Sequence, residues 1–209
     1  MTDAPRNRDV DVAVARRAAA VAGHTGDVEV ALHAVTHDDP GVRATALGAL
    51  ERLGQLTDEL LAQALGDADA TVRRRAAEVT ATHRDVDLIH ALHDADARVV
   101  EVAAWACGEH ESDRTDIVDR LMALAAEADE PLVRESAVAA LGAIGDERTV
   151  AVIIAATSDK PAVRRRAVLA LAPFDGDEVD AAVQRALTDR DWQVRQAAED
   201  LERAQLEFQ

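Results

Sequence analysis

Histidines and a single cysteine are the residues of this chain best suited to metal or nucleophilic chemistry. His33 and His37 stand four residues apart, and His90 and His93 three apart, so either pair could supply two corners of a metal site on a helix. The same histidines also fit solvated loops and helix ends. Cys107 lies in the alanine-rich string AAWACGEH, which favours a small core residue over a nucleophile. We therefore expect no catalytic residue, no metal and no cofactor, and a metal in the histidine-rich N-terminal half stays open as an alternative.

Valines followed by arginine mark a repeated unit. The string DDPGVRATALGALERLG returns as DEPLVRESAVAALGAIG, and five valines in all precede an arginine. A further unit has Val99 with Val100 in the arginine position, and a degenerate N-terminal copy has Val14. We call these valines the anchors. Successive anchors lie 27 to 34 residues apart, and they are Val14, Val42, Val72, Val99, Val133, Val163 and Val194.

Each unit is predicted to be a hairpin of two helices, A and B. An acidic residue usually stands three residues before the anchor, where it can cap the B helix, and Pro40, Pro131 and Pro161 stand two residues before it, in the first turn. Shorter amphipathic segments precede each B helix. They predict A helices at residues 27–35, 57–65, 85–92, 114–128, 147–157 and 177–187. Neither helix can bury its apolar face alone, so the hairpins must stack.

Composition narrows the class of protein and of partner. The chain of 209 residues is 48% hydrophobic but only 2% aromatic, so alanine, valine and leucine must build its core. The formal charge of −17 repels nucleic acids and anionic membranes, and it fits either a high-salt cytoplasm or a basic partner. No apolar run approaches the length of a membrane span, and residues 1–8 carry no signal for an ordered or exported segment. We expect a cytoplasmic protein with residues 1–8 loosely ordered.

The strings of the form acid–(Pro)–x–Val–Arg–x–x–Ala–x–x–Ala–Leu resemble the HEAT-repeat family, in particular its short prokaryotic phycobilisome-lyase HEAT-like repeats, over roughly residues 10 to 205. The resemblance implies an all-α fold, a right-handed α-α superhelical solenoid (HEAT-like or ARM-like) of about seven helical hairpins. It implies a single domain over residues 1–209, with a degenerate unit at about 9–25. It also implies a structural ladder in which arginines pair with acids at helix starts, formed by Arg43, Arg73, Arg134, Arg164, Arg195, Asp39, Asp69 and Asp191.

Residues two and three beyond each anchor, and Trp105 six beyond Val99, are predicted to lie on the B-helix face, away from the valine and alanine side. In the HEAT-like family this face is concave. We expect a non-catalytic scaffold that binds a protein or peptide there, and an exposed tryptophan would anchor such a partner. Burial of Trp105 among neighbouring alanines is the alternative. The predicted binding residues are Arg74, Arg75, Glu101, Trp105, Glu135, Arg165 and Arg166.

Enzymes that resemble this chain in fold define the alternative function. Phycobilin lyases share the repeat type, and HEAT-like deoxyhypusine hydroxylases hold two irons through repeated His–Glu dipeptides. This sequence has one such dipeptide, His110–Glu111. It also lacks the basic surface expected of HEAT-like DNA glycosylases, because Glu101 and Glu135 interrupt the arginines. A lyase-like or metal-dependent enzyme, or its accessory subunit, is therefore the second hypothesis, and nucleic acid is not an expected partner.

Overall fold

The chain folds into α-helical hairpins, as the sequence predicts. The computed structural model describes the backbone of residues 4–112 and 114–207 and the side chains of residues 9–112 and 114–204. No strand occurs in these ranges. The fold is an all-α helical repeat. The B helices are α1 (Ala4–Thr25), α3 (Pro40–Arg52), α5 (Ala70–Thr80), α6 (Ala97–His110), α8 (Pro131–Ile144), α10 (Pro161–Ala170) and α12 (Trp192–Glu207). The A helices are α2 (Val28–Ala34), α4 (Asp58–Leu65), α7 (Thr115–Glu127), α9 (Val150–Ala156) and α11 (Asp177–Ala186).

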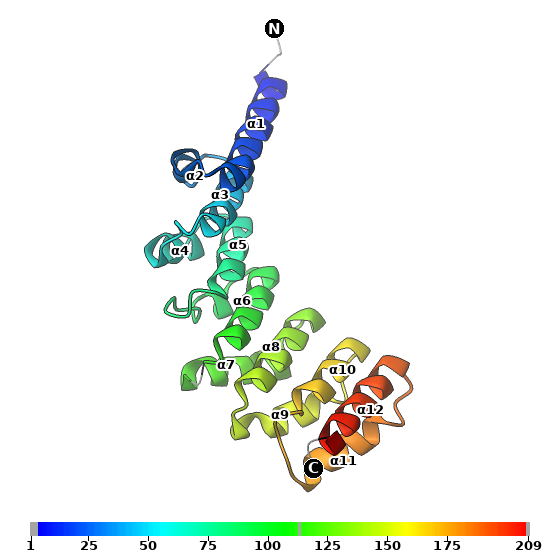
Figure 1. The fold of residues 1–209 in the computed structure, drawn as a ribbon. Helices are drawn as coiled ribbons and strands as arrows, with labels where there is room; N and C mark the ends of the chain where they lie inside the picture. The colour runs from blue at the N-terminus through cyan, green and yellow to red at the C-terminus, as the bar shows by residue number, and fades with distance from the viewer. Residues whose placement is uncertain (1–3, 113, 208–209) are drawn as a thin grey trace. The chain divides into compact units, whose positions relative to one another are not determined.

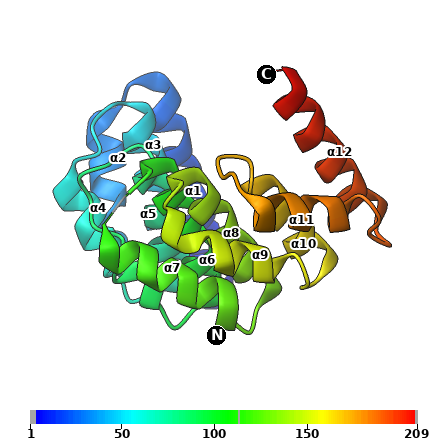
Figure 2. The ribbon, with the colours of Figure 1, turned by 90° about the horizontal axis from the view of Figure 1, so that it is seen from below.

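Two compact units make up the structure, Met1–Ala91 and Leu92–Gln209. In the first unit α1 packs on α3 and α3 on α5, while α2 and α4 cover the other side of these helices (Figure 1). In the second unit α6, α8, α10 and α12 pack in series, and α7, α9 and α11 follow one another beside them (Figure 2). Each unit is therefore a stack of hairpins with one layer of A helices and one of B helices. The arrangement as a single domain over residues 1–209 stays a prediction.

The B helices begin with capping aspartates and with prolines, as the sequence predicts. The side chains of Asp39 and Asp69 accept hydrogen bonds from the backbone N–H groups of Val42 and Thr71, and Asp191 does the same for Gln193. Such caps stabilise a helix by about 1 kcal/mol each. The helices α3, α8 and α10 each begin at a proline, where the missing N–H has no helical partner to lose. Asp39, Asp69 and Asp191 are thus occupied as caps.

The predicted A helix at residues 85–92 is wrong. This segment consists of turns followed by a 3-10 helix, η1 (Ala91–His93). The Asp87 side chain accepts a hydrogen bond from the N–H of Ile89, and this local bond competes with a helical backbone. Val86, Leu88 and Leu92 still reach the interior, so the segment keeps the packing role of an A helix without its conformation. The segment 147–157 is divided between a 3-10 helix, η2 (Glu147–Thr149), and α9.

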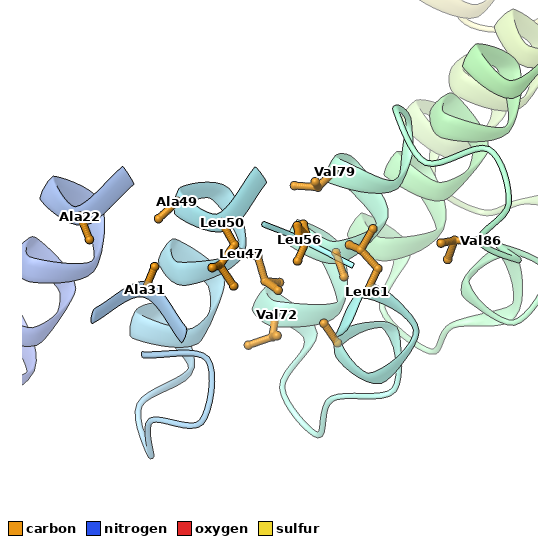
Figure 3. Packing of buried hydrophobic residues seen from close by; sticks show 12 residues of the cluster. Ala22, Ala31, Leu47, Ala49, Leu50, Leu56, Leu61, Val72, Val79 and Val86 are labelled. Carbon is orange, nitrogen blue, oxygen red and sulfur yellow. The ribbon is translucent and has the colours of Figure 1, made fainter. Parts of the chain in front are cut away.

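Small aliphatic side chains fill the core at fixed repeat positions. In the first unit, Leu47 and Leu50 of α3 point toward Leu61 of α4 and Val72 of α5 (Figure 3). In every repeat from that of Val42 onward, the side chains of the anchor and of the residues four and seven positions after it are at most 7% exposed. In the second unit α8 and α10 approach so closely that a Cβ atom at Gly142 would lie 2.6 Å from the Cα atom of Ala170. The scarcity of aromatic residues thus reflects close contact between helices.

The degenerate N-terminal unit differs from the others. Val14 occupies the anchor position of α1 but is 63% exposed, whereas Ala19 and Ala22 on the opposite side of the helix are buried against the next hairpin. Among the described residues, no A helix precedes α1. The unit therefore presents to solvent the face that every later B helix buries.

Candidate functional site

Three arginines that follow anchors join consecutive hairpins. The Arg43 guanidinium donates to both carboxylate oxygens of Asp67, at 2.8 and 2.7 Å, and to the carbonyl oxygens of His37 and Asp38 in its own turn. Arg134 binds Asp159, at 2.6 and 2.8 Å, and Arg164 binds Asp189, at 2.9 and 2.7 Å, in the same way. The acceptor thus belongs to the turn between the A and B helices of the next hairpin. Asp39 and Asp69, which the sequence suggested as partners, serve as caps.

These ion pairs are largely shielded from solvent. The Arg164 side chain is 6% exposed and that of Asp189 16%. The hydrogen bond from the arginine, together with its charge, holds the pKa of Asp67, Asp159 and Asp189 below the usual value. Arg73 and Arg195 each donate to the carbonyl oxygen of the turn before their own helix, that of Asp67 and Asp189 respectively. All five of these arginines thus bond to the turn before their own helix, and Arg43, Arg134 and Arg164 also bond to the next hairpin.

One junction of the second unit has no such pair. Val100 takes the arginine position and is buried. In the next hairpin, Ala128 stands five residues before the anchor, where Asp67 and Asp189 stand before theirs. The arginine is therefore lost at this junction, whereas an acid, Asp129, still stands four residues before the anchor, at the offset at which Asp159 precedes Val163. At this junction the helices pack closely, since a Cβ atom at Gly108 would lie 2.9 Å from the Cα atom of Ala140.

A groove opens on the B-helix face at the same junction. Its volume is about 440 Å³, and α6, α8 and α10 contribute its walls. Small residues of α6 and α8 let the two helices approach, and larger side chains stand around them. The lining residues are Glu101, Trp105, Gly108, Glu109, Leu132, Glu135, Ser136, Ala139, Ala140, Ala143 and Arg166.

Two large apolar side chains of this groove remain exposed. Trp105 is 41% exposed and Leu132, which follows Pro131 in the first turn of α8, is 57% exposed. Trp105 lies six residues beyond its anchor, outside the buried positions of the repeat. Between the two alternatives for Trp105, the structure therefore shows exposure and not burial among alanines. Exposed aromatic and aliphatic side chains next to a groove are typical of sites that anchor a partner.

Polar side chains of the groove pair between neighbouring B helices. Ser136 donates to Glu101 at 3.1 Å, and the guanidinium of Arg166 lies 3.7 Å from Glu135. Arg165 approaches the same carboxylate at 3.9 Å. Glu101 and Glu135 each stand two residues beyond an anchor. Their partners, Ser136 and Arg166, each stand three residues beyond the next anchor. The groove therefore has fixed polar walls. Among the described residues, the buried Nε atom of Arg166 has no hydrogen-bond partner.

Five of the seven predicted binding residues come together here. Glu101, Trp105, Glu135 and Arg166 line the groove, and Arg165 touches Glu135 beside it. The other two, Arg74 and Arg75, belong to α5 of the first unit, where Arg75 pairs with Glu78 at 2.9 Å. Leu132, Ser136 and Glu109 were not predicted. Ser136 stands three residues beyond its anchor, so the offset that pointed to the arginines would also have pointed to Ser136. Leu132 could not be predicted in this way, because its place in the groove depends on the distance between helices.

His83 bridges three elements of the first unit. Its Nε2 atom lies 2.9 Å from Glu51 of α3, and its Nδ1 atom lies 3.0 Å from Asp58 of α4. Burial of the ring lowers the pKa of His83, but the bonds and charges of the two carboxylates outweigh it and raise the pKa above its ordinary value. Across residues 9–112 and 114–204, no three histidine, cysteine or acidic side chains are arranged to hold a metal ion. Within the described chain, no helix has the length and apolarity needed to cross a bilayer.

Comparisons with known proteins agree with this architecture. A family model described as HEAT repeats matches residues 86–162, which include α6, α7 and α8. No curated protein matches the sequence. The solved structure of YibA from Escherichia coli is 20% identical with a TM-score of 0.66, over 84% of this chain and 68% of that one.

Two designed or engineered proteins are also similar in fold. A designed armadillo repeat protein, solved in complex with the peptide (KR)4, is 16% identical with a TM-score of 0.62, over 83% of this chain and 97% of that one. An engineered protein is 21% identical with a TM-score of 0.59, over 83% of this chain and 94% of that one.

Proposed function

We propose that this chain, a HEAT-repeat protein, binds an extended peptide segment of a partner protein in the groove formed by α6, α8 and α10. The exposure of Trp105 and Leu132 in one groove is the observation that carries the proposal. Both side chains stand on helices whose backbones are fixed by packing on their neighbours. A partner therefore meets a preformed surface, and little ordering of this protein opposes binding.

The negative charge of the groove favours a basic peptide segment of the partner. Glu101, Glu109 and Glu135 line the groove against one arginine, Arg166, and the chain as a whole has a formal charge of −17. A lysine or arginine side chain can lie against the face of Trp105, where such contacts contribute about 0.5 to 2 kcal/mol. The designed armadillo repeat protein of similar fold was solved with a peptide of alternating lysine and arginine, which supports the same class of ligand for this surface.

Titration with a labelled (KR)4 peptide tests the proposal. We expect saturable binding by fluorescence anisotropy that weakens as salt is raised, because exposed charges are screened. The Trp105→Ala variant should bind about tenfold or more weakly, the loss of roughly 1.4 kcal/mol or more expected of an aromatic anchor. Trp192→Ala is the matched control, because Trp192 is 65% exposed on α12 and lies outside the groove.

An acidic peptide of the same length should not bind. Equal effects of Trp105→Ala and Trp192→Ala, or equal binding of acidic and basic peptides, would contradict a basic segment at this groove.

The alternative of a lyase-like or metal-dependent HEAT-repeat enzyme, or its accessory subunit, is tested on the same preparation. A bound chromophore in the absorption spectrum or stoichiometric iron by metal analysis would favour that alternative.

A further inference from the structure

We propose that Arg165 and Arg166 form a carboxylate-binding subsite at the α10 end of the groove, and that the bound segment places an acidic side chain there. This inference rests on the proposed function, because the subsite adjoins the groove in which the basic segment lies. It narrows the partner to a segment that has lysine or arginine near Trp105 and an aspartate or glutamate further along its chain.

The guanidinium groups of Arg165 and Arg166 keep hydrogen-bond donors for a further acceptor. Their side chains are 37% and 38% exposed, and both approach one oxygen of Glu135, at 3.9 and 3.7 Å. These distances are longer than a hydrogen bond. Arg164 on the same helix, by contrast, donates two hydrogen bonds to Asp189. A guanidinium presents its donors as a planar fork that matches a carboxylate, so the exposed pair suits that group.

The repeat explains why Arg165 turns back to Glu135. Between the earlier B helices of this unit, the residue two positions beyond an anchor contacts the residue three positions beyond the next anchor, as Glu101 contacts Ser136. Arg165 has the first of these positions. The second position, on α12, is Ala197, which is buried and has no polar side-chain atom. The stack therefore supplies no acceptor for Arg165 at the place where the repeat would put one.

The charges at the α10 end match a carboxylate better than a phosphate. Arg165, Arg166 and Glu135 together carry one net positive charge, since two guanidinium groups surround one carboxylate. One carboxylate of the bound segment would neutralise this charge. A phosphorylated side chain carries about −1.5 to −2 at neutral pH and would leave an excess of negative charge beside Glu135.

The surface continues across α10, which favours an acidic side chain over the C-terminal carboxylate of a peptide. Leu169 is 40% exposed on this helix and stands six residues beyond its anchor, as Trp105 does on α6. A segment that reaches the two arginines can therefore continue past them along an exposed apolar residue. We assign the carboxylate to an aspartate or glutamate within the segment.

Helix packing sets the spacing between the basic and the acidic residue. In this unit α6 packs on α8, and α8 packs on α10. The axes of packed helices lie about 8 to 10 Å apart, so Trp105 and the two arginines are about 16 to 20 Å apart. An extended chain rises about 3.3 Å per residue. We therefore expect the acidic residue about five or six positions from the basic residue that contacts Trp105.

Three labelled peptides with amidated C-termini test the subsite on the full chain. The aspartate peptide has two lysine–arginine pairs, a Gly-Ser-Gly-Ser spacer and then aspartate, five residues from the last arginine. The asparagine peptide has asparagine in its place, and the displaced peptide has the aspartate directly after the last arginine. By fluorescence anisotropy we expect the aspartate peptide to bind at least about fivefold more tightly than the asparagine peptide, and the displaced peptide to gain less than about twofold.

Variants of the two arginines locate this gain. Arg165→Gln combined with Arg166→Gln should reduce the ratio of the two affinities to about one, because the guanidinium donors are lost. The control with the same change in charge is Arg185→Gln combined with Arg190→Gln, which lie exposed in the same unit outside the groove and should keep the ratio. Arg165→Glu should favour a peptide with lysine in place of the aspartate, a reversal that a folding defect would not produce.

Four outcomes would overturn the subsite. Equal, saturable binding of the aspartate and asparagine peptides would do so and leave the basic segment at the groove in place. A gain that persists in the double glutamine variant would exclude these two arginines. A gain from an asparagine peptide with a free C-terminus, with none from the aspartate side chain, would assign the subsite to a chain end. If no peptide binds, the proposed function is wrong and the subsite with it.

Discussion

The ion pair between Arg164 and Asp189 provides the sharpest test of how the hairpins hold together. Replacing Asp189 by alanine removes two hydrogen bonds to a guanidinium that is 6% exposed and one to the backbone N–H of Asp191. Breaking a buried pair on one side costs about 3 to 5 kcal/mol. Because Asp189 is 16% exposed and water can reach part of the site, we expect a loss of about 2 to 3 kcal/mol in the free energy of unfolding.

Urea unfolding followed by circular dichroism measures this loss, with Asp200→Ala as the control. Asp200 contacts Arg203 at 3.2 Å, but the two side chains are 51% and 64% exposed, so the control should lose less than about 0.5 kcal/mol. The double variant Arg164→Met with Asp189→Leu should recover most of the stability, because no buried charge is left without a partner. Similar losses for Asp189→Ala and Asp200→Ala would refute the structural role of the pair.

The same pair has a defined dependence on pH. The pKa of Asp189 is lower in the folded protein than in the unfolded chain, where it is about 3.9. Its contribution is therefore complete at pH values above the unfolded pKa and is lost as the pH falls through the folded pKa. The difference in stability between the wild-type protein and Asp189→Ala should be constant from about pH 5 to 7 and shrink below about pH 4.

Two further replacements test other contacts. Gly142→Ala should destabilise the protein by about 1 to 3 kcal/mol in thermal unfolding, because the added Cβ atom meets the backbone of Ala170. Gly66→Ala is the control and should not destabilise it, because the nearest atom to its added Cβ would be 3.5 Å away. Equal effects of the two replacements would contradict close packing of α8 on α10. His83→Gln should destabilise more at pH 6 than at pH 9, because the raised pKa of His83 makes its contribution complete below about 6.5 and lost as the pH rises through the folded value. A difference in stability that does not change over this range would show that the charged form of His83 is not what bridges the two carboxylates.

Much of the fold follows from local patterns in the sequence. The anchors from Val42 onward are buried, and the prolines and capping aspartates stand where B helices begin, because these features depend on a few neighbouring residues. The turn at residues 85–92 was missed for the same kind of reason. The spacing of its apolar residues suits a helix, but the hydrogen bond from the backbone N–H of Ile89 to the Asp87 side chain favours a turn. The spacing of apolar residues alone does not show which of the two conformations is favoured.

The candidate site depends on contacts between hairpins, which the sequence specifies less directly. The partner of Arg43 is Asp67 and not Asp69, because the offset between stacked turns decides which acid faces the guanidinium. The exposure of Trp105 follows from its place on the helix, but its neighbour Leu132 comes from the next B helix. The missing ion pair between α6 and α8 was visible in the sequence as Val100, because the repeats with anchors at Val42, Val72, Val133, Val163 and Val194 carry arginine at that position.

The fluorescence of Trp105 on addition of the (KR)4 peptide tests most directly whether the groove of α6, α8 and α10 binds a basic segment. The chain has two tryptophans, so the Trp192→Phe variant leaves Trp105 as the sole tryptophan emitter. We expect a saturable change in the emission of Trp105, at peptide concentrations that match the anisotropy titration, and no change in the Trp105→Phe variant. Peptide binding without a response from Trp105, or with a response from Trp192 alone, would contradict binding in this groove.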